Sequence, residues 1–68
     1  MERLVGTVGE FDAHAGFGTV MAGDGRGFWF HCTAIADGSR TIDAGTEVSF
    51  DVVAGHLGRW EAAHLDPT

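Results

Sequence analysis

The chain has 68 residues, which gives room for one domain over residues 1–68 with a modest core. A chain of this size buries only about 60% of the surface that its unfolded form exposes. A catalytic cleft with a cofactor pocket would fit poorly in it, so we expect neither an enzyme nor a cofactor. Ten acidic residues and four arginines give a formal net charge of −6. This excess of acid is the opposite of the basic patch that nucleic-acid binders usually carry.

Cys32 is the only cysteine, which excludes an internal disulfide and the disulfide-rich class of secreted domains. The first residues contain no basic segment followed by a long apolar run, and no apolar stretch is long enough to span a bilayer. We therefore expect a cytoplasmic protein with no membrane partner.

The apolar residues alternate with a period of two and are often interrupted by glycine, of which there are eleven. No long window has apolar residues at helical spacing, so strands are the better template. The pattern predicts strands over residues 4–11, 16–21, 28–31, 46–53 and 59–65, a helical turn over 32–35, a polar loop over 36–45 and a turn over 55–58.

A hairpin is predicted between the second and third of these strands, because Asp24-Gly25 lies between two apolar runs and both positions tolerate positive φ. Five short antiparallel strands in so small a chain favour a closed barrel, since closure removes exposed edges. A bulge is expected in the first strand, because Val8 and Glu10 would otherwise share a face. The residues expected to face inward are Val8, Val20, Phe28, Phe30, Ile35, Val48, Phe50 and Val52.

Large aromatic side chains are predicted on the outer faces of the second and third strands. Phe17 lies on one of them and Trp29 and His31 on the other, so the hairpin makes the three side chains neighbours. An exposed aromatic cluster needs a reason, because large apolar surfaces are costly to leave in water. Stacking of unpaired bases is one such reason, since every base has a π-face.

The same residues carry a resemblance to a known family. Gly16-Phe17-Gly18 followed by Phe28-Trp29-Phe30-His31 is similar to the two ribonucleoprotein-type motifs of bacterial cold-shock proteins, roughly K-G-F-G-F-I and V-F-V-H-F. Shorter matches extend over nearly the whole chain, at Gly6-Thr7-Val8, Phe11-Asp12, Thr33-Ala34-Ile35, Asp43-Ala44-Gly45, Glu47-Val48-Ser49-Phe50 and Ala62-Ala63-His64-Leu65. The resemblance implies an all-β, five-stranded antiparallel OB-fold barrel of the cold-shock-domain type. It also implies binding of single-stranded DNA or RNA and an RNA-chaperone role, without a cofactor.

The chain departs from the family pattern at several contact positions, where it has Glu10 for a tryptophan, Ala15 for a lysine, Thr19 for an aromatic residue and Cys32 for another. The stacking residues that remain, and that we assign to nucleic-acid binding, are Phe11, Phe17, Trp29 and His31. Arg59 and Trp60 are secondary candidates for contact. With few platforms and many acids, we expect binding no tighter than the micromolar range.

A protein-interaction module is the alternative from a different class. Tryptophan is a favoured anchor of protein interfaces, so the same aromatic patch would serve a protein partner or a weak homodimer. Trp60 is expected on the outer face of the last strand, with Ala63 and Leu65 pointing inward, as a lid over the barrel rim.

Metal and nucleophile sites are disfavoured. Cys32 directly follows His31, so a strand would aim the two side chains apart and no Cys-His pair forms. No ligand spacing typical of a metal site is present among the histidines, which are His14, His31, His56 and His64.

Overall fold

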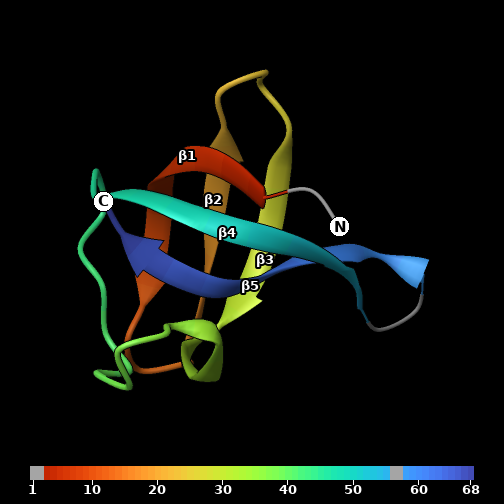
Figure 1. Cartoon of the computed structure of the whole chain (residues 1–68). Coiled ribbons are helices and arrows are strands. Elements are labelled where there is room, and N and C mark those ends of the chain that lie inside the picture. The colour runs from red at the N-terminus through yellow and green to blue at the C-terminus, as the bar shows by residue number, and fades with distance from the viewer. Residues whose placement is uncertain (1–2, 56–57) are drawn as a thin grey trace.

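The structure is a computed structural model that describes residues 3–55 and 58–68. Almost all regular structure in these residues is extended (Figure 1). The strands are β1 (Arg3–Asp12), β2 (Phe17–Ala22), β3 (Gly27–His31), β4 (Glu47–Ala54) and β5 (Trp60–Pro67), and a short 3-10 turn, η1, covers Cys32–Ala34. The predicted strands are confirmed, with each end displaced by two residues or fewer. The middle of the predicted turn, residues 56–57, lies outside the described residues.

The strands that the structure describes close into a barrel in the order β1-β2-β3-β5-β4, with β4 returning to β1. The directions of neighbouring strands cannot alternate all the way around a ring with an odd number of members. One pair must therefore be parallel, and this pair is β3 with β5, joined at Trp29 and Glu61. The five-stranded barrel is confirmed, and its pairing is antiparallel everywhere except at this seam.

The predicted bulge is present in β1. Its register against β2 shifts between Val8 and Glu10, so that Val8 is buried and Glu10 is exposed. The next side chain, Phe11, returns to the inner side of the sheet. Its ring stacks on that of Phe30, with centroids 5.8 Å apart and planes 10° from parallel.

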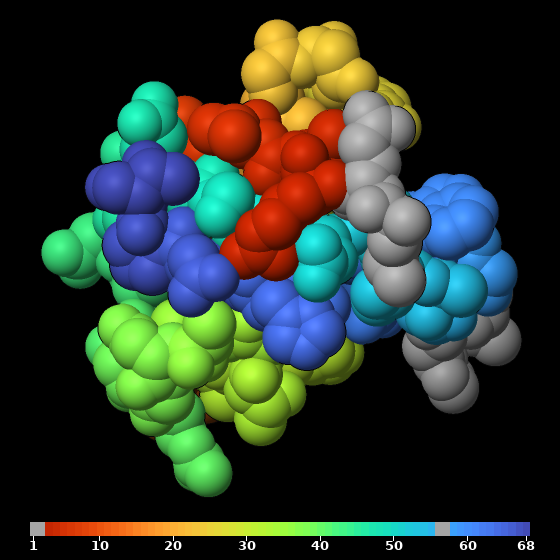
Figure 2. Space-filling model, in the orientation of Figure 1, coloured from red at the N-terminus to blue at the C-terminus, as the bar shows by residue number. Residues whose placement is uncertain are grey.

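The core fills the barrel and is wholly apolar in the part of the chain that is described. Seven of the eight residues expected inside are buried, while Val52 is partly buried and packs against the others. On the face shown in Figure 2, side chains of β1, β4 and β5 cover this interior. The buried hydrophobic residues among those described are Val8, Val20, Ala22, Phe28, Phe30, Ile35, Val48, Phe50, Ala62 and Leu65.

A second irregularity lies in β5 and corrects two expectations. The register of β5 against β4 shifts near its middle, and His64 takes a positive φ of 53°. Ala62 and Leu65, three residues apart, therefore both face the core, whereas Ala63 was expected there. Because side chains alternate along a strand, Trp60 lies on the same side of β5 as Ala62 and not on the outer face.

Arg3 ties three strands together across this irregularity. Its guanidinium lies 3.0 Å from Asp51 on β4 and 2.6 Å from Asp66 on β5, and it donates to the backbone oxygen of His64 at 2.8 Å. The His64 Nδ1 atom is 2.9 Å from the other oxygen of Asp51. Hydrogen bonds from Arg3 and then from His64 hold the pKa of the Asp51 carboxyl below its usual value.

Gly18→Ala should destabilise the barrel by about 1–3 kcal/mol, because the space around Gly18 is filled and an added carbon would overpack it. A Cβ at this position would clash with the backbone oxygen of Glu10 and would lie 2.9 Å from the ring of Phe30. Gly27→Ala is the matched control, since a Cβ there meets nothing within 4 Å. Equal free energies of unfolding for the two variants in urea would contradict the packing described for Gly18.

Asp51→Asn should lower the Tm at neutral pH and lose this effect in acid. A carboxyl whose folded-state pKa is depressed stabilises the fold above its unfolded pKa, usually 3.8, and this stabilisation disappears as the pH falls through the folded value. Thermal unfolding between about pH 7 and pH 2 measures the difference. Asp43→Asn removes an exposed carboxylate for which the described residues offer no hydrogen bond or ion pair, and it controls for net charge. A Tm difference for Asp51→Asn that persists unchanged in acid would refute the assignment.

Candidate nucleic-acid interface

The outer surface of the β2–β3 hairpin carries three neighbouring ring side chains. In the register of the two strands, Phe17 lies opposite His31, and Trp29 is the next outward residue on β3. The rings of Phe17 and Trp29 are in contact, with centroids 4.9 Å apart and planes inclined by 36°. Trp29 is 43% exposed, His31 is exposed and Phe17 is half-buried. These three side chains, called the aromatic face below, are the neighbours that the sequence predicted.

The turn that aligns the two strands has the chemistry expected of it. Gly25 adopts a positive φ of 92°, and the backbone N–H of Ala22 donates to the oxygen of Arg26 at 2.8 Å. Asp24 accepts hydrogen bonds from the backbone N–H of Arg26 at 3.0 Å and from its Nε at 2.7 Å. These two interactions, the backbone bond first, lower the pKa of the Asp24 carboxyl. The hairpin register, and with it the aromatic face, depends on this turn.

His31 lies at the end of the aromatic face next to β5. Its Nε2 atom is 3.9 Å from the carboxylate of Glu61, and its side chain is 68% exposed. The carboxylate therefore contacts the edge of the imidazole, while most of the ring is open to solvent and to a stacking partner.

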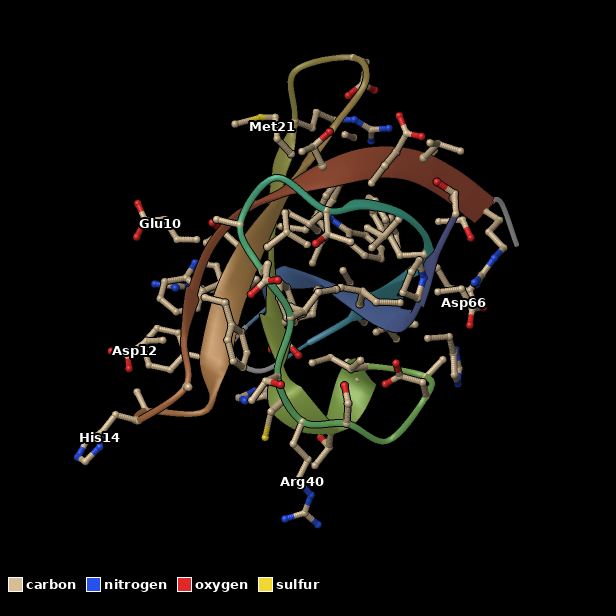
Figure 3. The ribbon with its side chains drawn as sticks, turned by 90° about the vertical axis from the view of Figure 1, so that its left-hand side faces the viewer. Glu10, Asp12, His14, Met21, Arg40 and Asp66 are labelled. Carbon is tan, nitrogen blue, oxygen red and sulfur yellow. The ribbon has the colours of Figure 1, made fainter. Side chains whose placement is uncertain are left out.

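Two carboxylates border the aromatic face on the side of β1. The register places Glu10 in the same cross-strand row as Trp29, and Asp12 in the row of Phe17. Both project from the same side of the barrel (Figure 3). Asp12 also accepts hydrogen bonds from two backbone N–H groups of the following turn, at 3.0 and 3.1 Å. The bulge in β1 turns the carboxylate of Glu10 outward. The negative charges of Glu10 and Asp12 therefore repel a phosphate that approaches this edge of the aromatic face.

Phe11 is the predicted stacking residue that the structure does not bring into the aromatic face. It alternates with Glu10 and Asp12 along β1, so its ring is on the inner side and half-buried against Phe30. The bulge predicted between Val8 and Glu10 has this consequence, which the assignment of Phe11 to the stacking residues overlooked: with Glu10 turned outward, Phe11 must turn inward.

A groove of about 770 Å³ opens beside the aromatic face. It lies between β3 and β5, which diverge on the N-terminal side of their pairing at Trp29 and Glu61 (Figure 1). The hairpin end of β2–β3 and the outer end of β4–β5 both project from the barrel body (Figure 2). The walls of the groove include Arg26, Phe28, Trp29, Val52, Arg59 and Trp60.

The groove joins residues that the sequence treated separately. Arg59 and Trp60, the secondary candidates, lie in it together with Trp29 of the aromatic face. Arg26 was missed, because Asp24-Gly25 marked its segment as a turn and nothing more. Its guanidinium carbon lies 5.5 Å from the centroid of the Phe28 ring, and the spacing of two residues between Arg26 and Phe28 is the sequence feature that could have revealed this contact.

Other kinds of site find no support in residues 3–55 and 58–68. No three His, Cys, Asp or Glu side chains come together there in a way that could hold a metal ion. Cys32 is a free, partly buried thiol close to Gly16, and His56 lies outside the described residues. No helix in the described part of the chain has the length and apolar character needed to cross a membrane.

A closed five-stranded barrel with aromatic side chains on the outside of its β2–β3 hairpin defines an OB-fold domain. The family model of the "Cold-shock" DNA-binding domain matches residues 4–67. Cold shock protein 2 of Lactiplantibacillus plantarum is 38% identical over 63 residues, which are 91% of this chain and 94% of that protein. Cold shock protein CspC of Bacillus subtilis is 43% identical over 54 residues, or 78% and 82% of the two chains. The chain belongs to the cold-shock domain family.

A solved structure shows the same fold. Drosophila Unr CSD456 matches with a TM-score of 0.81 and 29% identity over 98% of this chain, which spans only 27% of that longer one. Members of the cold-shock domain family bind single-stranded nucleic acid and are not enzymes. Nucleic-acid binding is therefore the general function of this chain.

The contact between Phe17 and Trp29 should appear as a coupling free energy of about 0.5–1.5 kcal/mol in a double-mutant cycle. The cycle compares Phe17→Ala, Trp29→Ala and the double variant by denaturant unfolding. A second cycle of Phe17→Ala with Trp60→Ala should show almost no coupling, because Trp60 lies in the groove. Equal coupling in both cycles would mean that the rings do not pack as described.

Proposed function

We propose that this chain binds a single strand of RNA or DNA weakly, by stacking bases on the aromatic face. The observation that carries the proposal is the contact between Phe17 and Trp29 on an outer surface of the sheet, with His31 beside them. A stacked base contributes about 1–3 kcal/mol and is tolerant of sequence, so the aromatic face supplies affinity without base-specific readout. A contact of the nucleic acid with Phe11 stays a prediction, and the inward ring of Phe11 does not support it.

The charge distribution supports weak binding. Glu10 and Asp12 border the aromatic face, the chain has a net charge of −6, and it contains no lysine. Few phosphate contacts mean that few counterions are released, so affinity should fall only shallowly with salt. We infer a dissociation constant no tighter than micromolar. Weak and sequence-tolerant contacts suit an RNA chaperone, which must release its strand.

We further propose that residues 1–68 act as one domain in the cytoplasm, as a monomer or weak homodimer. A second candidate function, favoured by the exposed apolar side chains, is docking of a protein partner on the same surface. Trp29 on this surface is 43% exposed, and tryptophan is a common interface anchor. Sedimentation at increasing concentration, with a Trp29→Ala variant that stays monomeric, would favour this candidate.

Trp29→Ala should weaken binding of a labelled oligothymidine by about 5- to 150-fold, the loss expected for one stacked base. Fluorescence anisotropy at low and moderate salt measures both the affinity and its salt dependence. Val5→Ala is a suitable control, because it removes exposed apolar surface on β1 without touching the aromatic face. No binding by the parent protein at high micromolar concentration and low salt would refute the proposal, as would unchanged affinity in the Trp29 variant.

A further inference from the structure

The groove between β3 and β5 gathers positive charge that the rest of the molecule lacks. Two of the four arginines, Arg26 and Arg59, line it, and no carboxylate of the described residues does. Of the other two, Arg3 is occupied by its contacts with Asp51 and Asp66, and Arg40 lies in the loop after η1. In a chain with a net charge of −6, this is a local site for an anion.

The guanidinium groups in the groove have donors to offer. The guanidinium of Arg59 makes no salt bridge or hydrogen bond with the residues that the structure describes, and only its backbone oxygen is bonded, to the N–H of Gly55. Arg26 pairs with Asp24 through Nε at 2.7 Å, and its two Nη groups have no hydrogen-bond partner among the described residues. A guanidinium carries five N–H donors, most of them on Nη, and binds phosphate in a forked geometry. The groove can therefore hold a phosphate, although the pairing with Asp24 makes Arg59 the stronger partner.

The same groove also offers an aromatic platform. Trp60 is 62% exposed, the largest exposed fraction among the large apolar side chains described, and it lies on the inner side of β5 facing the groove. Phe28 and Val52 provide an apolar floor. A free phosphate would leave this apolar surface unused, and an apolar peptide would leave the arginines unused. A nucleotide has both a flat aromatic base and a phosphate.

We propose that this groove is a further nucleotide site, in which a base stacks on Trp60 and its phosphate contacts Arg59, with Arg26 on the opposite wall. Trp29 borders both the groove and the aromatic face, so the site receives the next nucleotide of the strand that lies on that face. This inference rests on the proposed function and lengthens its binding path. Oligonucleotides that reach past Trp29 therefore bind more tightly than those that only cover the aromatic face.

The two tryptophans allow each site to be observed separately, because the chain has no other tryptophan and no tyrosine. Trp29→Phe keeps an aromatic ring on the face and leaves Trp60 as the sole fluorophore, while Trp60→Phe leaves Trp29. Oligothymidines of about three and about seven nucleotides bracket the lower range of site sizes for an OB fold. The longer oligonucleotide should quench Trp60 in the first variant, and the shorter should not. Both should quench Trp29 in the second.

Arg59→Ala should weaken binding of the longer oligothymidine by about fivefold or more and reduce the slope of log affinity against log salt by about one. Arg40→Asn is the matched control, because it removes the same charge outside the groove, and asparagine tolerates the φ of 64° at that position. The loss for Arg59→Ala should exceed that for Arg40→Asn.

The outcomes separate the two proposals. Quenching of Trp29 by the longer oligonucleotide, with the emission of Trp60 unchanged at saturation, overturns the groove site and leaves the aromatic face standing. Equal losses for the Arg59 and Arg40 variants also overturn it, since the effect is then one of net charge. No response of either tryptophan at high micromolar oligonucleotide overturns both proposals.

Discussion

The closure of an odd number of strands into one ring is the constraint on which the structure depends. It forces a parallel pair, and the chain places that pair between β3 and β5. These two strands pair at Trp29 and Glu61, and they diverge on the N-terminal side of that pair (Figure 1). The groove occupies that divergence, and the aromatic face lies on the neighbouring hairpin. The features that bear on function are thus grouped around the seam where the barrel closes.

The local part of this arrangement could be predicted from the sequence. Alternating apolar residues define the strands, and Asp24-Gly25 defines a hairpin whose register makes Phe17, Trp29 and His31 neighbours. These predictions hold because each depends on residues close together in the chain. The bulge in β1 was also predictable, since Val8 and Glu10 could not both face the core.

The parts that escaped prediction depend on contacts between distant segments. Ala62 replaces Ala63 in the core because β5 slips against β4, and the same slip brings Trp60 to the inner side of β5. Arg26 and Arg59 line one groove because β3 and β5 meet there, a pairing that no local pattern encodes. Facing in a strand reverses with a shift of one residue, so small errors of register exchange a core residue for a contact residue.

The seam also has a mechanical meaning. Among the described residues, β3 and β5 are joined by one pair, whereas the other neighbours in the ring share several. Backbone hydrogen bonds near a short junction open at a lower free energy than those inside long ladders. A strand of nucleic acid that contacts both Trp29 on β3 and Trp60 on β5 would link the two strands across their junction. Because this ligand binds only the closed barrel, its binding raises the free energy of unfolding by mass action. The stability of the barrel then depends on the concentration of nucleic acid.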